Sequence, residues 1–354
     1  MEANRYRRPT DDNHLCSHNQ NNKEGELKLN KPLMIAVKAL VMVAAVLAAP
    51  AMGGDVIGIS KIVSHPALDA IERGIQEELQ RLGHDFDYDL QNANGDISTA
   101  ASIANKFKSQ KVTIAVGIAT PTSQALVNAI TDIPVVFSAV TDPVGAGLVA
   151  SLAHGDRNVT GVSDMTPVKQ QIELLHRIKP LKRLGHIYSS HEANAVTLAR
   201  MAAEACKQLG IEFVETTVTN SAEVKQAVQT VANRVDGIYI STDNTVVSAL
   251  GAVVDVARDA GVPVMSADPS SAEQFGVLAA WGFDYYKMGR ATGTLIAEIL
   301  EGKAPQSIPV RFMTDPSDVD LLVNLDVAAN LGLRIPEDVV AKAKTIVKDG
   351  KIRK

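Results

Sequence analysis

From Asp55 onward, short runs rich in Val and Ile alternate with longer segments of helical period, and the same alternation occurs twice along the chain. Parallel β-sheets built from βα units have this pattern, because their strands are buried on both faces and their crossover helices are amphipathic. The first copy predicts strands at residues 55–60, 85–90, 111–117 and 134–139, and helices at 66–82, 97–109 and 122–130. The second copy predicts strands at 184–189, 211–218, 237–242 and 263–267, and helices at 193–209, 222–235 and 245–260. The chain is therefore expected to form an α/β fold.

Three turn sequences recur in register between the two copies: Leu82-Gly83 and Leu209-Gly210, Pro134 and Pro263, and Asp142-Pro143 and Asp268-Pro269. Together with the matching element order, they predict two Rossmann-like lobes with parallel sheets. A further helix at 286–300 and further strands predict crossings between the lobes near 161–167, 281–284 and 310–320. Lobe 1 would then hold residues 55–162 plus about 285–310, and lobe 2 residues 163–284 plus about 311–354. A hinge with several crossings predicts closure of the lobes around a ligand.

The first 51 residues are expected to lie outside the fold. Residues 39–49 form an unbroken apolar run that follows Lys38 and ends in Ala49-Pro50-Ala51, as in a secretory signal with a small-residue cleavage site. We predict export to the periplasm with cleavage near Ala51. Because Met34 opens a compact signal, the polar residues before it are interpreted as a non-native extension. A retained membrane anchor is the alternative, although a spanning helix needs about 20 apolar residues.

The composition excludes several classes of protein. With 35 Lys and Arg against 40 Asp and Glu, the chain lacks the basic surface of a nucleic-acid-binding protein. Cys16 and Cys206 have neither Cys-x-x-Cys spacing nor neighbouring histidines, so no disulfide framework, metal site or cofactor is predicted. The string at 145–150 matches G-x-G-x-x-A but follows a fourth strand, and so we do not interpret it as a dinucleotide site. The sequence has no P-loop, nucleophile elbow or H-E-x-x-H motif, and no catalytic residue is predicted.

Candidate binding residues lie in the loops that follow the predicted strands, because ligands of open α/β sheets bind beyond the carboxyl ends of the strands. Thr120-Pro121-Thr122 has a helix-start signature whose free N–H groups can hold a carboxylate, with a simple N-cap as the alternative. In the second copy Glu192, Asp243 and Asp268 can pair with a ligand ammonium or else cap the helices that follow them. Asp142 in the duplicated Asp-Pro pair either contacts the ligand or only starts a turn. Three lesser candidates for hydrogen bonding are Thr141, Asn194 and Asn244.

Two rings are also candidates. His65 follows the first predicted strand and either starts a helix or faces the ligand. Trp281 is the single tryptophan, and it either stacks on a ligand or packs in the core.

Four strings resemble the ABC-transporter substrate-binding proteins of the tryptophan/tyrosine type: Ser64-His65-Pro66-Ala67-Leu68-Asp69, Gly117-Ile118-Ala119-Thr120-Pro121-Thr122, Val136-Phe137-Ser138-Ala139-Val140-Thr141-Asp142-Pro143 and Gly282-Phe283-Asp284-Tyr285-Tyr286. The resemblance spans essentially the whole chain after the leader. It implies a periplasmic-binding-protein type I fold. It also implies a ligand that in related members is an aromatic amino acid such as tryptophan, phenylalanine or tyrosine.

A free amino acid needs one set of groups for each of its three parts. We assign Thr120 and Thr122 to its carboxylate and Asp243 or Asp268 to its ammonium, with Glu192 and Asn194 in support. His65, Val140 and Trp281 are expected to line the side-chain pocket.

The resemblance implies binding without catalysis. Its implied partners are an amino acid and a membrane ABC permease with its ATPase, and no nucleic acid. The protein is expected to be a monomer. A sugar- or nucleoside-type ligand sensor on the same fold is one alternative, and a Rossmann-type enzyme is another.

Overall fold

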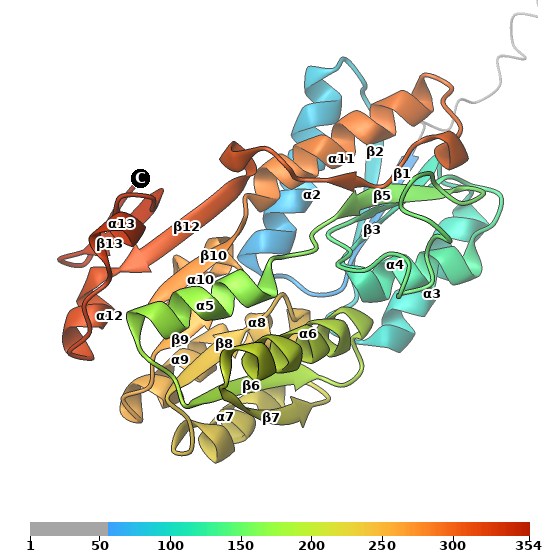
Figure 1. Ribbon diagram of the computed structural model, residues 1–354. Helices are drawn as coiled ribbons and strands as arrows, with labels where there is room; N and C mark the ends of the chain where they lie inside the picture. Colours follow the sequence, from blue (N-terminus) through green and yellow to red (C-terminus); the bar gives the residue numbers. More distant parts are fainter. Residues whose placement is uncertain (1–55) are drawn as a thin grey trace, which may run out of the picture. The chain divides into compact units, whose positions relative to one another are not determined.

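Residues 56–354, which the computed structural model describes, form two α/β lobes, each built on its own sheet (Figure 1). The predicted leader and its cleavage site fall outside the described residues. Asp55, predicted to open the first strand, falls there too.

The sheet of lobe 1 is parallel throughout and has the strand order β11-β5-β4-β3-β1-β2. Its central strands are apolar because helices cover both faces, so that every residue of β3 and β4 is buried. The strands are β1 (Val56–Lys61), β2 (Asp87–Asn92), β3 (Ile114–Ile118), β4 (Val135–Ser138), β5 (Val159–Ser163) and β11 (Arg311–Phe312), and the helices are α2 (Pro66–Arg81), α3 (Ile97–Gln110) and α4 (Thr120–Ala129).

The sheet of lobe 2 has the strand order β14-β13-β12-β10-β9-β8-β6-β7. Two of its pairings are antiparallel, β10 with β12 and β13 with β14. The strands are β6 (Arg183–Ser189), β7 (Glu212–Val218), β8 (Gly237–Ile240), β9 (Val264–Ser266), β10 (Ala279–Phe283), β12 (Val319–Asn324), β13 (Thr345–Lys348) and β14 (Lys351–Arg353). The α-helices are α5 (Val168–Ile178), α6 (Ala193–Leu209), α7 (Val224–Ala232), α8 (Asn244–Ser248), α9 (Leu250–Asp259), α10 (Pro269–Ala272), α12 (Leu325–Asn330) and α13 (Glu337–Val340). Short 3-10 turns lie at Ser221–Glu223, Pro305–Ser307 and Pro316–Asp318.

The internal duplication is visible in the strand orders β2-β1-β3-β4-β5 and β7-β6-β8-β9-β10, which are the same. The copies diverge after the fifth strand, where β11 joins lobe 1 in parallel and β12 joins lobe 2 antiparallel.

One predicted helix is wrong in detail. The segment predicted as a single helix at 245–260 forms α8 and α9, because Ala249 between them leaves the helical region with φ −114° and ψ 21°.

The chain passes between the sheets three times: after β5, after β10 and after β11. The second passage leads into α11 (Tyr285–Leu300), whose buried residues belong to the same apolar core as β1. The third lies between Phe312 of lobe 1 and Val319 of lobe 2. Three connections in parallel favour a hinge over a flexible tether.

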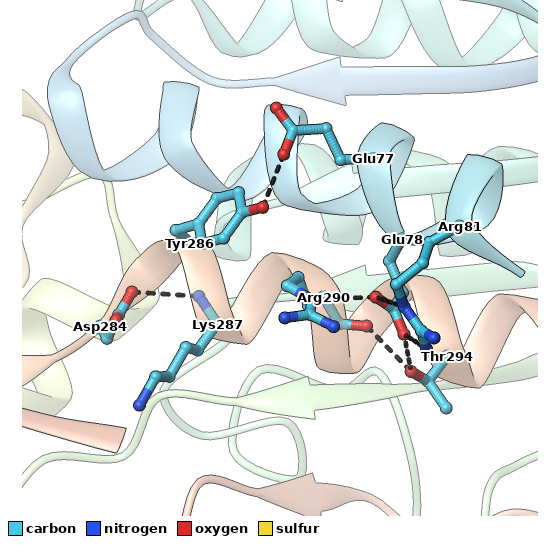
Figure 2. A network of polar contacts seen from close by, with 8 residues as sticks. All are labelled: Glu77, Glu78, Arg81, Asp284, Tyr286, Lys287, Arg290 and Thr294. Carbon is cyan, nitrogen blue, oxygen red and sulfur yellow. Dashed lines mark hydrogen bonds and ion pairs between the residues drawn. The ribbon is translucent and has the colours of Figure 1, made fainter. Parts of the chain in front are cut away.

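Helix α11 lies beside α2 in Figure 1, although the two helices come from opposite ends of lobe 1 in the sequence. Between them the carboxylate of Glu78 accepts hydrogen bonds from Arg81, Arg290 and Thr294, as Figure 2 shows. Arg81 Nη2 and Arg290 Nε lie 2.6 and 2.9 Å from its oxygens. Chiefly through Arg81, and against the opposing effect of burial, these donors lower the pKa of Glu78 to about 2.

This network predicts a loss of stability in acid. An unfolded glutamate takes up a proton near pH 4.5, whereas the folded Glu78 does so only near 2, so its stabilising contribution is complete above about 4.5 and disappears as the pH falls through about 2. Because both arginines are largely exposed, we expect the contribution to be about 1 kcal/mol. Urea denaturation of Glu78→Gln and wild type at pH 7 and pH 3 measures it. An equal gap between the two proteins at both pH values would contradict the assignment.

Candidate functional site

A cavity with a free interior of about 20 Å³ lies between the two lobes, and both lobes contribute its walls. Its lining residues come from strand-end loops, first turns of helices and two of the crossing segments: His65, Ala67, Leu68, Ala139, Asp164, Asn194, Thr242, Asp243, Asn244, Val247, Asp268 and Tyr285. This interior holds about one water molecule, so an organic ligand can enter only when the lobes move apart.

Four polar atoms in this lining are buried without a hydrogen-bond partner: His65 Nε2, Asn194 Oδ1, Thr242 Oγ1 and Asp268 Oδ2. Residues 56–354 contain eight such side-chain atoms, so half of them meet at one cavity. An unpaired buried polar group costs about 1–3 kcal/mol. A ligand with matching polar groups would remove that cost.

The lining carries three carboxylates, those of Asp164, Asp243 and Asp268, and no Lys or Arg side chain belongs to it. All three side chains are almost fully buried. Burial raises the pKa of Asp164 to about 6. Burial and the nearby Glu192 raise the pKa of Asp243 to about 8. The cavity therefore favours a ligand that carries positive charge.

The three acids differ in how much of each carboxylate the protein itself engages. Asp243 caps α8 through Val246 N at 2.9 Å and accepts from Ser189 N with its other oxygen at 2.5 Å. Asp164 accepts from Thr141 Oγ1 at 2.9 Å and from the Tyr285 hydroxyl at 3.3 Å. Asp268 caps α10 through Ser271 N at 3.1 Å, and its Oδ2 remains unpaired. Of the three, Asp268 has the oxygen available to a ligand ammonium.

Five of the residues predicted from the sequence line this cavity, namely His65, Asn194, Asp243, Asn244 and Asp268. Glu192 stands directly behind them. Its carboxylate accepts from the side chains of Asn244 and Thr245 at 2.5 and 2.7 Å and from the backbone N–H of Thr245 at 2.9 Å. It thereby fixes the start of α8 without lining the cavity.

Thr120 and Thr122 do not line the cavity. The N-cap of α4 is Ala119, not Thr120. The Thr122 hydroxyl donates to the carbonyl of Ile118 at 2.6 Å, and Ser123 N donates to the carbonyl of Ala119 at 3.2 Å. The Thr122 hydroxyl and the Ser123 N–H are thus engaged by the chain's own backbone, whereas Thr120 Oγ1 is buried without a partner.

Four other predicted residues also lie outside the lining. Val140 is fully buried in the core of lobe 1. Thr141 orients Asp164, and Asp142 accepts from Gly145 N at 2.8 Å and so fixes a turn. Trp281 packs beside Leu321 and Val339 in a separate surface groove of lobe 2. The structure thus places the single tryptophan away from the cavity.

The sequence analysis missed Asp164, Tyr285 and Thr242, together with the apolar wall of Ala67, Leu68, Ala139 and Val247. Asp164 lies in the predicted crossing at 161–167, and Tyr285 directly follows the one at 281–284, where only Trp281 was a candidate. Backbone strain marks the strand-end loops of lobe 1, where Ala119 and Ala139 have φ of 76° and 55°. Non-glycine residues with positive φ cluster at functional sites, but this signal is not visible in a sequence.

The match to known families and proteins covers most of the chain. The model of the family described as ABC transporter substrate binding protein matches residues 56–347. A tyrosine-binding protein of Clostridioides difficile strain R20291 is 37% identical over 283 residues, which is 78% of this chain and 81% of that protein. A crystal structure of an ABC domain from Streptococcus pneumonia in complex with L-Trp is 33% identical, covers 83% of this chain and 100% of its own, and has a TM-score of 0.79.

A third comparison bears on the arrangement of the lobes. The ligand-free, open structure of CD0873 from Clostridium difficile is 37% identical and covers 80% of this chain and 97% of its own, but its TM-score is only 0.61. The structure therefore resembles the L-Trp complex more than the open form, despite the lower sequence identity of the complex. A contact of 3.5 Å between His65 Nδ1 of lobe 1 and Ser271 Oγ of lobe 2 is consistent with closed lobes.

More distant solute-binding proteins, at 15% and 16% identity, superpose with a TM-score of 0.55. They show the shared periplasmic-binding-protein type I fold and carry no argument about the ligand.

Proposed function

Because the chain belongs to the family of ABC transporter substrate binding proteins, we propose that the molecule it binds between its lobes is a free amino acid with an aromatic side chain. Tryptophan, phenylalanine and tyrosine are the candidates. The observation that carries this proposal is the meeting of three buried carboxylates and four unpaired polar atoms at a cavity whose lining has no basic side chain. A ligand ammonium supplies the positive charge that such a lining lacks.

Two of the relatives support the aromatic class, since one is named as tyrosine-binding and the other holds L-Trp. The apolar lining can receive a ring: Ala67, Leu68, Ala139 and Val247 are small or aliphatic, and the ring of Tyr285 is the aromatic part of the wall. We assign the ammonium to Asp268, with Asp164 nearby and with Asn194, Asp243 and Asn244 in support. A neutral sugar or nucleoside would leave the acids without a countercharge, and the family does not favour an enzyme.

The mechanism proposed is capture, closure and delivery. A ligand that contacts both lobes stabilises the closed arrangement by its differential affinity for that state. The closed protein then presents the amino acid to an ABC permease and its ATPase. We propose that the protein acts as a monomer, because each chain supplies both lobes. Sedimentation velocity measures the mass of the particle in solution and tests this.

Proteins of this family act outside the cytoplasm. Over residues 56–354 no helix is both long and apolar enough to cross a membrane. We propose that residues 1–51 are an export leader removed near Ala51, on the strength of the apolar run 39–49 and the small residues after it. The N-terminal sequence of the exported protein tests the cleavage site.

Thermal unfolding of ligand-stripped protein tests the ligand class. A true ligand at about 100 times its dissociation constant stabilises the native state by roughly 2.7 kcal/mol, which is a shift of a few degrees. We expect such a shift with at least one of L-tryptophan, L-phenylalanine and L-tyrosine, and none with glucose or adenosine. A shift with a sugar or nucleoside but with no amino acid would overturn the proposal.

A further inference from the structure

The first turn of α2 forms part of the cavity wall, because Ala67 and Leu68 both line it. N–H groups in the first turn of a helix have no acceptor within the helix, and the helix dipole adds partial positive charge there. Asp69, in the same turn, donates its own N–H to the carbonyl of His65 at 3.0 Å. The N–H groups of Ala67 and Leu68 are thus the ones left without an acceptor at the cavity end of this 16-residue helix.

A second group points to the same place. His65 is the N-cap of α2 and is only 8% exposed, and its Nε2 is one of the unpaired atoms of the cavity lining. The other ring nitrogen, Nδ1, lies 3.5 Å from Ser271 Oγ. With no Lys or Arg in the lining, the His65 imidazole is the one side chain there that can become a cation near neutral pH.

We propose that His65, as an imidazolium, and the first turn of α2 bind the carboxylate of the amino acid, so that binding of the zwitterion takes up a proton at His65. This inference rests on the proposed function and adds the protein groups that bind the negative charge of the ligand, its carboxylate. It replaces α4 with α2 as the helix that receives the carboxylate. It places the two ligand charges on opposite lobes, with the carboxylate on lobe 1 and the ammonium at Asp268 of lobe 2.

Burial lowers the pKa of His65, although the acids around it act in the opposite direction. The groups that interact with the ring are Asp268 before α10, Asn244 and Glu192 around the start of α8, and Asp69 of α2. Asp69 is itself held by Lys61 Nζ and Ser64 Oγ, each at 2.7 Å. A ligand carboxylate beside the ring raises its pKa, because an opposite charge at contact distance favours the charged form. Affinity for the zwitterion then falls as the pH rises through the interval between the free and the bound pKa.

Paired ligands test the carboxylate contact. L-Tryptophan and tryptamine, or L-tyrosine and tyramine, share the ammonium and ring and differ in the carboxylate. Isothermal titration of wild type should give a dissociation constant about 10- to 100-fold lower for the amino acid, as expected for charge-assisted hydrogen bonds. In His65→Ala this ratio should shrink by about tenfold, with the remainder supplied by the helix N–H groups. His191→Ala is the matched control, since His191 occupies the equivalent loop of lobe 2, is exposed and does not line the cavity.

Proton uptake is measured by repeating the wild-type titrations in buffers of different ionisation enthalpy. A ligand carboxylate close to buried acids also favours protonation of those acids, so the same titrations are repeated with His65→Gln to separate the ring from the rest of the lining. A greater proton uptake with L-tryptophan than with tryptamine, lost in His65→Gln, supports the imidazolium. The glutamine keeps a polar side chain at this buried position, so the test does not depend on the folding of His65→Ala. No difference between about pH 5.5 and 8 overturns the inference.

The outcomes separate the two proposals. Wild type that binds an aromatic amino acid with no preference over its amine overturns the role of His65 and leaves the proposed function intact. Wild type that binds neither L-tryptophan nor L-tyrosine nor L-phenylalanine overturns the proposed function, and this inference with it.

Discussion

Asp268→Asn weakens the binding of an aromatic amino acid by about 30-fold or more, because it removes the buried carboxylate that pairs with the ammonium. The substitution keeps the size of the side chain and an oxygen that can cap α10, since Ser271 N needs only one acceptor. The loss should therefore appear in affinity and not in folding. Isothermal titration with L-tryptophan and L-tyrosine measures it, and circular dichroism verifies the fold.

The internal duplication supplies the matched control. Asp142-Pro143 is the lobe 1 counterpart of Asp268-Pro269, but Asp142 fixes a half-buried turn through Gly145 N and does not line the cavity. Asp142→Asn should leave the dissociation constant within about twofold of wild type, as usual for a substitution away from the site. Equal losses in the two variants would contradict the placement of the ammonium site in lobe 2.

A second readout comes from the unpaired oxygen of Asp268. A buried carboxylate with one unpaired oxygen destabilises the ligand-free protein. Asp268→Asn should therefore raise the thermal midpoint of the ligand-free protein while it weakens ligand binding. This is the opposite of the effect that a purely structural role for Asp268 predicts. A lower midpoint without ligand would indicate that the carboxylate holds the fold together.

The fold could be predicted from the sequence because its signals are local and occur twice, whereas the family was identified from the resemblance of four strings. Apolar strand runs and helical periods each depend on a few neighbouring residues, and the recurrence of Asp142-Pro143 as Asp268-Pro269 fixes the register of the copies. The two α/β lobes, the family resemblance and the role as the substrate-binding component of an ABC-type system are all confirmed. The elements after the second copy have no counterpart in the first, and the antiparallel pairing of β12 with β10 had no local signal.

The cavity could be predicted only in part. His65, Asn194, Asp243, Asn244 and Asp268 were identified because each follows a strand, and that position is visible in a sequence. Asp164 and Tyr285 were missed for a physical reason. They lie in or directly after the crossing segments, and whether a crossing faces the cavity depends on how the lobes close.

Thr122 is the converse case, since it was predicted to bind the ligand carboxylate and lies outside the cavity lining. The same N–H and hydroxyl groups can cap a helix or hold an anion, and the local sequence does not distinguish these uses. In this structure the Thr122 hydroxyl donates a hydrogen bond to the carbonyl oxygen of Ile118, 2.6 Å away. The helix start that does face the cavity, at Pro66, has no side-chain cap at all, and its N-cap residue is His65.

Gly289→Ala should destabilise the protein by about 2–3 kcal/mol, because it places a methyl group where two helix backbones touch. A Cβ at Gly289 of α11 would lie 2.3 Å from the carbonyl oxygen of Ile71 in α2, and a Cβ at Gly74 would lie 2.4 Å from that of Tyr286. Backbone atoms cannot rotate away as side chains can, so the helices must separate. The higher helix propensity of alanine, about 1 kcal/mol, offsets only part of this cost.

Gly276→Ala is the control, since its Cβ would meet Val254 and Val327 at an ordinary 3.7 Å and should change stability by less than about 1 kcal/mol. Urea denaturation at pH 7 compares the two variants with wild type. The same displacement of α11 moves Tyr285, its first residue and part of the cavity wall, so Gly289→Ala should also weaken ligand binding. Wild-type stability in Gly289→Ala would mean that the α2–α11 contact is loose enough to admit a methyl group. In that case the packing of α11 against α2 would not be what positions Tyr285 in the cavity wall.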